Sequence, residues 1–157
     1  MNLPDYQSPS IIQDILKHSR IAIVGLSSNE LRASHFVGFY LKRHGYDIIP
    51  VNPREESVLG ATSYPSLLEV PGTVDVVDVF RDPAAVPEIA EQAGAIGAKA
   101  LWLQFGVISE EGISIAEAAG LDVVADRCLK IEHARFLGRM HWLGFNTDVI
   151  SARRKPT

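Results

Sequence analysis

The stretch Arg20-Ile21-Ala22-Ile23-Val24-Gly25-Leu26-Ser27-Ser28-Asn29 decides the fold of this chain. Its four consecutive apolar residues, which end at Val24, predict a strand buried on both faces, a pattern typical of a parallel sheet. Gly25 ends the strand, and small polar residues follow it. From Ser34 to His44 apolar residues then recur close to helical spacing. The stretch therefore predicts a strand, a tight turn and a helix.

The turn after this strand is the first candidate binding element. In an open α/β sheet a nucleotide phosphate lies at such a turn, because free backbone N–H groups and the helix dipole favour an anion there. We expect a diphosphate to be held by the backbone and hydroxyl groups of the turn and by one cation, namely Gly25, Leu26, Ser27, Ser28, Ser34 and Arg32. The alternative is a purely structural turn, which every strand–helix unit needs.

Two common nucleotide motifs are absent from the turn. The dinucleotide fingerprint G-x-G-x-x-G requires three glycines and only Gly25 is present, which disfavours NAD and FAD. No Gly-Lys-Ser/Thr follows, so a Walker-type loop is excluded. The next predicted strand, 46–51, ends in Asn52-Pro53-Arg54, where an NAD-binding fold places an acidic residue for the ribose diol. An arginine at this place favours a phosphorylated ribose.

Strands alternate with helices along the rest of the chain. The pattern predicts strands at 74–80, 99–105 and 121–125, and helices at 11–16, 34–44, 83–93 and 110–119, with Gly94 and Gly97 closing the third helix. We expect the first helix to cover an edge of the sheet, and 55–65 to be a polar connection. The fold class is α/β: a single Rossmann-like, doubly wound parallel sheet of about five strands with helices on both faces.

Length and composition limit the function classes. The 157 residues suit one domain, and the apolar and charged fractions of 46% and 22% are those of a globular protein without a membrane span. A formal charge of −4 gives no support for nucleic-acid binding, and the basic residues 153–155 suit a solvated tail. The N-terminus lacks the pattern of a secretory signal, and the single cysteine suits a reducing cytoplasm.

Ligands of parallel sheets bind outside the carboxyl ends of the strands, so the strand ends form the candidate site. These ends carry Gly25 to Ser28, Asn52 to Arg54, Phe80 and Arg81, Gln104 to Gly106, and Asp126 to Cys128. Together with the flanking segments Trp102 to Val107 and Asp126 to His133, they resemble the small stand-alone CoA-binding domain proteins. That family is similar to the nucleotide-binding domain of the succinyl-CoA synthetase α-subunit, and the resemblance covers roughly Ile11 to Leu137.

The resemblance implies that the ligand is coenzyme A or an acyl-CoA. The first loop and the Asn52-Pro53 turn would handle its nucleotide end, while Phe80, Arg81 and Gln104 would line the path of the ADP and pantetheine parts. Gly106 and Cys128 complete the expected site. The sequence identifies no metal ligands and no protein partner.

A binding module is favoured over an enzyme. Succinyl-CoA synthetase, the ligase of the resemblance, has a second domain and a histidine that carries a phosphoryl group. In this chain His133 falls in a helix-like segment, and solvated or packing roles suit His35, His44 and His141. We expect Asp126 and Glu132 to act in capping and ion pairing with Arg127 or Lys130. The alternatives are an NADP-dependent oxidoreductase in which Arg54 binds the 2′-phosphate, and a nucleotide-sensing regulatory module.

Cys128 supports two hypotheses. It follows a predicted strand directly, and Arg127 and Lys130 lie close enough in sequence to favour a thiolate, which can form a mixed disulfide with the CoA thiol as a redox-responsive cysteine. Alternatively, it is a small buried residue that packs the last helix onto the sheet.

Overall fold

The computed structural model of the chain describes residues 1–137, so the predicted basic tail and His141 lie outside the described residues. The elements are η1 (Leu3–Tyr6), α1 (Pro9–Leu16), β1 (Arg20–Val24), α2 (Ala33–Arg43), β2 (Asp47–Val51), β3 (Ser57–Val58), β4 (Ala61–Thr62), η2 (Leu67–Glu69), β5 (Val76–Val79), η3 (Pro83–Ala85), α3 (Val86–Ala95), β6 (Ala100–Leu103), α4 (Glu110–Ala118), β7 (Asp122–Ala125) and α5 (Leu129–Phe136). In this part of the chain no helix is both long and apolar enough to cross a membrane.

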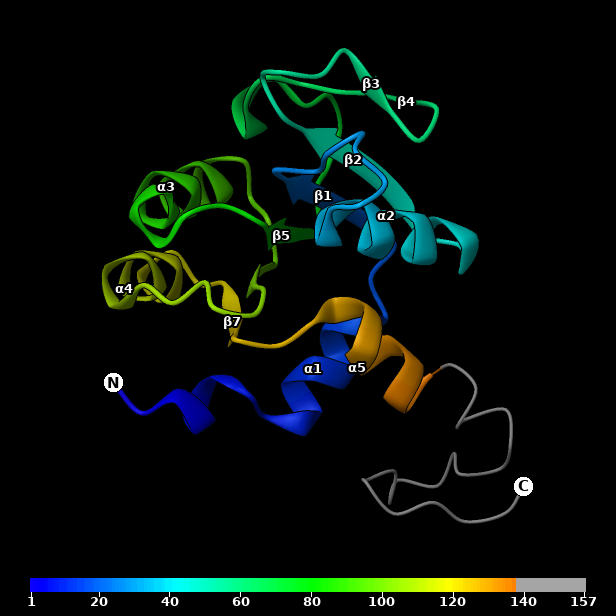
Figure 1. Cartoon of the computed structure of the whole chain (residues 1–157). Coiled ribbons are helices and arrows are strands. Elements are labelled where there is room, and N and C mark those ends of the chain that lie inside the picture. The colour runs from blue at the N-terminus through cyan, green and yellow to red at the C-terminus, as the bar shows by residue number, and fades with distance from the viewer. Residues whose placement is uncertain (138–157) are drawn as a thin grey trace, which may run out of the picture.

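Five of the strands form one parallel sheet in the order β2-β1-β5-β6-β7. Helices α3 and α4 lie on one face of this sheet and α1, α2 and α5 on the other, as Figure 1 shows. The chain leaves β1 toward β2 and then returns to place β5 on the opposite side of β1, so the winding direction changes between β1 and β5. The doubly wound Rossmann-like fold predicted from the sequence is confirmed.

Each face of the sheet has its own apolar core, because successive side chains of a strand point to opposite faces. Val77 and Val79 of β5 pack with Ile89 of α3 and Ile113 of α4. Val76, one residue earlier, packs with the second core, which contains Val37 and Leu41 of α2 and the fully buried Trp102 of β6. Burial on both faces explains the near-continuous apolar runs of these strands.

Helix α1 lies beside the edge strand β7, and its buried Ile12, Ile15 and Leu16 belong to the same core as Trp102. Two predictions about local structure are wrong. The expected polar connection 55–65 contains the antiparallel hairpin β3–β4. Gly94 lies inside α3 and does not close it: a Cβ there would lie 2.9 Å from the Cβ of Ala119, so glycine permits the close packing beside α4.

Candidate functional site

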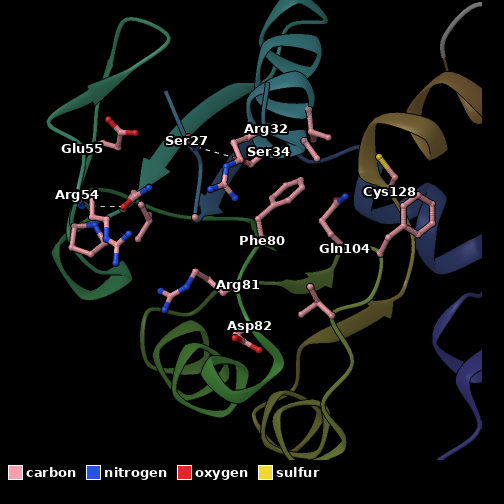
Figure 2. A pocket seen from close by; sticks show the side chains of 18 residues that line it. Ser27, Arg32, Ser34, Arg54, Glu55, Phe80, Arg81, Asp82, Gln104 and Cys128 are labelled. Atoms are coloured by element: carbon pink, nitrogen blue, oxygen red, sulfur yellow. Dashed lines mark hydrogen bonds between the residues drawn. The ribbon is translucent and has the colours of Figure 1, made fainter. Parts of the chain in front are cut away.

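A pocket of about 780 Å³ opens at the carboxyl ends of the strands (Figure 2). It lies where the winding direction changes, since Gly25 follows β1 and Phe80 follows β5. Its walls come from the segments after β1, β2, β5 and β6 and from the starts of α2 and α5. The lining residues are Gly25, Ser27, Arg32, Ala33, Ser34, Val37, Val51, Asn52, Pro53, Arg54, Glu55, Phe80, Arg81, Asp82, Gln104, Phe105, Val107 and Cys128.

Gly25 is required by the geometry of the pocket floor. Its φ is +92°, which side chains disfavour, and a Cβ at this position would overlap the backbone carbonyl oxygen of Phe80. The Gly25 N–H donates to the carbonyl oxygen of Val51 at 2.8 Å, and the Phe80 N–H donates to that of Val24 at 2.8 Å. The turns after β1 and β5 therefore meet backbone to backbone beneath the pocket.

Three N–H groups of the first loop, those of Ser27, Ser28 and Asn29, donate to side chains of the protein. The Ser27 N–H donates to Ser34 Oγ at 3.1 Å, and the Asn29 N–H donates to Ser27 Oγ at 3.0 Å. The backbone N–H and the hydroxyl of Ser28 both donate to Oε2 of Glu55, each at 2.8 Å. These donors are engaged within the protein, because short polar side chains compete for loop N–H groups.

The second loop is tied to the first by Asn52. Its Nδ2 donates to the carbonyl oxygen of Leu26 at 3.0 Å, and its Oδ1 accepts from the Arg54 N–H at 3.0 Å. Both functional ends of the amide are thus used to fix the two loops relative to each other. Asn52 lines the pocket, and these bonds position the neighbouring Pro53 and Arg54 at its rim.

Three arginines, Arg32, Arg54 and Arg81, come to the pocket from three different segments. Arg32 precedes α2, Arg54 follows β2, and Arg81 follows β5, and all three are exposed. Within residues 1–137 none of them is in an ion pair. Exposed guanidinium groups that are not in an ion pair are suited to bidentate binding of phosphate oxygens.

The opposite wall is formed by Gln104 and Cys128. The buried Gln104 accepts from the Leu129 N–H at 3.1 Å through Oε1, which satisfies one free donor at the start of α5. Cys128 immediately precedes α5 and is only 7% exposed, yet it lines the pocket. Both features expected of Cys128, burial in the core and a place at the site, are therefore found together.

Three predicted site residues do not line the pocket. Leu26 is fully buried in the core under α2, Ser28 is bonded to the lining residue Glu55, and the Gly106 N–H donates to Asp126 Oδ1 at 2.8 Å. Six lining residues lie outside the strand ends and the turn that the sequence singles out: Ala33, Val37, Val51, Glu55, Asp82 and Val107. Glu55 had a signal in the sequence, since it is the first acidic residue after the second strand and directly follows Arg54.

His133, His44 and Glu132 form contacts within the protein and do not line the pocket. His133 is buried and its Nδ1 lies 2.9 Å from the Tyr40 hydroxyl, while His44 Nδ1 lies 2.7 Å from the Tyr40 carbonyl oxygen. Burial raises the pKa of Glu132, against a smaller effect of nearby arginines. Glu132 pairs with Arg135 at 3.8 Å, and not with the expected Arg127 or Lys130.

A doubly wound parallel sheet with a pocket at its switch point, lined by polar and apolar residues, defines a Rossmann-like α/β domain. Residues 19–134 match the CoA binding domain family, and the chain belongs to this family. The resemblance drawn from the strand-end motifs is thus confirmed.

Similar proteins fall into two groups, small proteins and large ligases. The chain is 40% identical to the uncharacterized protein YneT of Bacillus subtilis (strain 168), covering 82% of this chain and 97% of that one. A solved hypothetical protein from Pyrococcus horikoshii OT3 has a TM-score of 0.83 at 40% identity, covering 88% of this chain and 98% of that one. ADP-forming acetate–CoA ligase II of Archaeoglobus fulgidus is 30% identical over 72% of this chain, but the match spans only 17% of the ligase.

Proposed function

We propose that this protein binds coenzyme A or an acyl-CoA in the pocket at the carboxyl ends of the strands, without catalysing a reaction of its own. The proposal rests on the family and on the pocket together. Because the match spans 17% of the related ligase, the activity named for that enzyme is not carried over to this chain.

The observation that carries the proposal is the set of three arginines around one pocket. CoA combines a diphosphate and a 3′-phosphate at its nucleotide end, and guanidinium groups from three segments offer separate partners for these anions. The pocket volume of about 780 Å³ is within the range of roughly 300–1,000 Å³ that is usual for small-molecule sites. An extended ligand can leave part of its length outside.

The far wall supports a direction for the bound ligand. The arginines lie on the side of the first and second loops, whereas Gln104 and Cys128 lie on the side of α5, as Figure 2 shows. We infer that the nucleotide end lies toward the arginines and that the pantetheine arm runs past Phe80 toward Gln104 and Cys128. This direction would bring the CoA thiol to the side of the pocket where Cys128 lies.

Thermal unfolding with and without ligands tests the proposal. CoA is expected to raise the melting temperature, because a ligand at 100 times its Kd stabilises the folded state by about 2.7 kcal/mol. NAD and NADP at equal concentration are the matched controls. A shift with NADP and none with CoA would contradict the proposal and favour an NADP-dependent protein. If CoA raises the melting temperature, calorimetric titration of CoA gives its Kd.

A further inference from the structure

Glu55 places a negative charge on the loop where the fold is expected to bind a ligand phosphate. Its Oε2 accepts the backbone N–H and the hydroxyl of Ser28, both at 2.8 Å, and the residue lines the pocket. A phosphate oxygen at the turn after the first strand of a Rossmann-like sheet uses the same kind of donor. The carboxylate therefore holds donors that a ligand anion needs.

Three other N–H groups of the first loop are engaged within the protein. The N–H groups of Ser27 and Asn29 are bonded to Ser34 Oγ and Ser27 Oγ, and the Leu31 N–H donates to Asn29 Oδ1 at 2.9 Å. These bonds join residues of the loop and the start of α2 to each other, so breaking them would remodel the loop. The bonds to Glu55 join the loop to a side chain of a different loop, which can rotate away.

The Glu55 side chain carries a negative charge that no ion pair among the described residues neutralises. The Ser28 N–H, followed by the Ser28 hydroxyl, lowers the pKa of Glu55 below its ordinary value, so that the group is an anion at neutral pH. Neither Arg54 beside it in the chain nor any other described cation forms an ion pair with it. The charge is thus free to repel a second anion at the same loop.

We propose that the carboxylate of Glu55 occupies a phosphate position of the first loop in the ligand-free protein and is displaced when a nucleotide diphosphate binds there. The inference rests on the proposed function and adds a determinant of ligand affinity to it. Glu55 acts as an internal competitor: it lowers the affinity for any ligand whose phosphate needs the Ser28 N–H. Ligands with further phosphates, held by the arginines, offset this cost.

Calorimetric titration of CoA and ADP into wild type, Glu55→Gln and Glu55→Ala tests the inference. Both variants are expected to bind both ligands roughly fivefold more tightly, the effect of removing one like charge about 4 Å away in a watery site. Glu56→Gln is the matched control, because Glu56 is exposed in the same loop, carries the same charge and does not line the pocket. It is expected to leave both Kd values within about twofold of wild type.

The outcomes separate the two proposals. CoA binding that is equal or weaker in both Glu55 variants, or an equal gain in Glu56→Gln, overturns the role of Glu55 and leaves the proposed function intact. No binding of CoA by wild type or by any variant overturns both. Melting curves of the free proteins show whether each variant is folded at the titration temperature.

Discussion

Tyr40 and His133 join helices α2 and α5 through a hydrogen bond of 2.9 Å between the Tyr40 hydroxyl and His133 Nδ1. The His44 ring stacks on Tyr40 with a centroid separation of 4.0 Å and meets the His133 ring edge-on at 5.0 Å. Burial, with a smaller contribution from His44, lowers the pKa of His133 to about 4. The helix that begins beside Cys128 is therefore held to α2 by a neutral histidine.

This contact predicts a loss of stability in mild acid. In the unfolded chain His133 takes up a proton below its ordinary pKa of about 6.5, whereas in the folded protein it stays neutral down to about pH 4. The unfolded state then binds more protons, so the free energy of unfolding falls as the pH drops through this window, by at most about 1.4 kcal/mol per pH unit. Urea unfolding between pH 7.5 and 4.5 measures the slope.

The variant His133→Gln is expected to flatten that slope, since glutamine does not titrate. It is expected to be less stable than wild type at pH 7.5, because the packing and the bond to Tyr40 are altered. His18→Gln, outside this cluster, serves as the control and is expected to retain the wild-type slope. An unchanged slope in His133→Gln would show that another group causes the acid sensitivity.

Replacing the buried Asp78 by an apolar residue is expected to stabilise the protein. It is fully buried in β5 between Ile23 of β1 and Trp102 of β6, and neither carboxylate oxygen has a hydrogen-bond partner within residues 1–137. Asp78→Val is expected to raise the free energy of unfolding at pH 7 by about 1–3 kcal/mol, the cost of burying an unsatisfied polar group. Asp122→Val, at the exposed start of β7, controls for strand propensity.

The pH dependence of this gain has a defined sign. Burial raises the pKa of Asp78 well above its ordinary value, so the folded protein keeps a proton that the unfolded chain releases above about pH 4. Stability contributed by Asp78 therefore falls as the pH rises above that value. Denaturation of wild type and Asp78→Val at pH 5 and pH 8 is expected to give the larger difference at pH 8, and a larger difference at pH 5 would contradict the assignment.

Arg81 is predicted to contribute to CoA affinity without being needed for folding. It is exposed at the end of β5 and lines the pocket, so Arg81→Ala removes a guanidinium and no core packing. Charged hydrogen bonds contribute about 1.5–3 kcal/mol, so the Kd for CoA is expected to rise by roughly one to two powers of ten. Arg43→Ala, on the exposed side of α2, is the control; equal affinities of all three proteins by calorimetry would remove Arg81 from the site.

Cys128 is predicted to form a mixed disulfide with the ligand under oxidising conditions. Its thiolate would attack CoA disulfide, forming one protein–CoA disulfide and releasing one CoA thiol. Because the sulfur-bearing residue is 7% exposed and lines the pocket, we expect the reaction to need the pocket, and excess ADP to slow it. Intact mass spectrometry without reductant should show one CoA that dithiothreitol removes.

Cys128→Ser provides the matched variant for this measurement. It keeps the size of the side chain and removes the reactive sulfur, so it should acquire no adduct. If wild type gains nothing, or the serine variant gains the same mass, Cys128 is a core residue and any CoA binding is non-covalent.

The sequence predicted the sheet well because burial on both faces leaves apolar runs that few other structures share. Val76 to Val79 and Ala100 to Leu103 lie inside such runs, and the pocket follows from where those runs stop. Short secondary-structure elements are harder to predict from the sequence. The hairpin β3–β4 has only two residues per strand, too few to give an alternating pattern.

The part of the site that sequence reasoning missed depends on contacts between loops. Arg54 stands where an NAD-binding sequence has its acidic residue. Glu55, one residue later, accepts from Ser28 across two loops that Asn52 also joins. Likewise, the sequence does not show that Ser34 and Glu55 accept N–H groups of the first loop, which a phosphate loop would leave free. Such pairings join residues up to 27 positions apart and leave no periodic signal.

The overlap that any side chain at residue 25 would make with the Phe80 carbonyl oxygen has a practical consequence for mutational scanning. In a library that covers every position, all substitutions of Gly25 are expected to score as damaging, although the residue has no side chain to contact a ligand. A screen for ligand binding alone would rank this residue beside Arg81. A parallel measurement of the abundance of folded protein would separate Gly25 from Arg81, since only substitutions of Gly25 should lower the abundance.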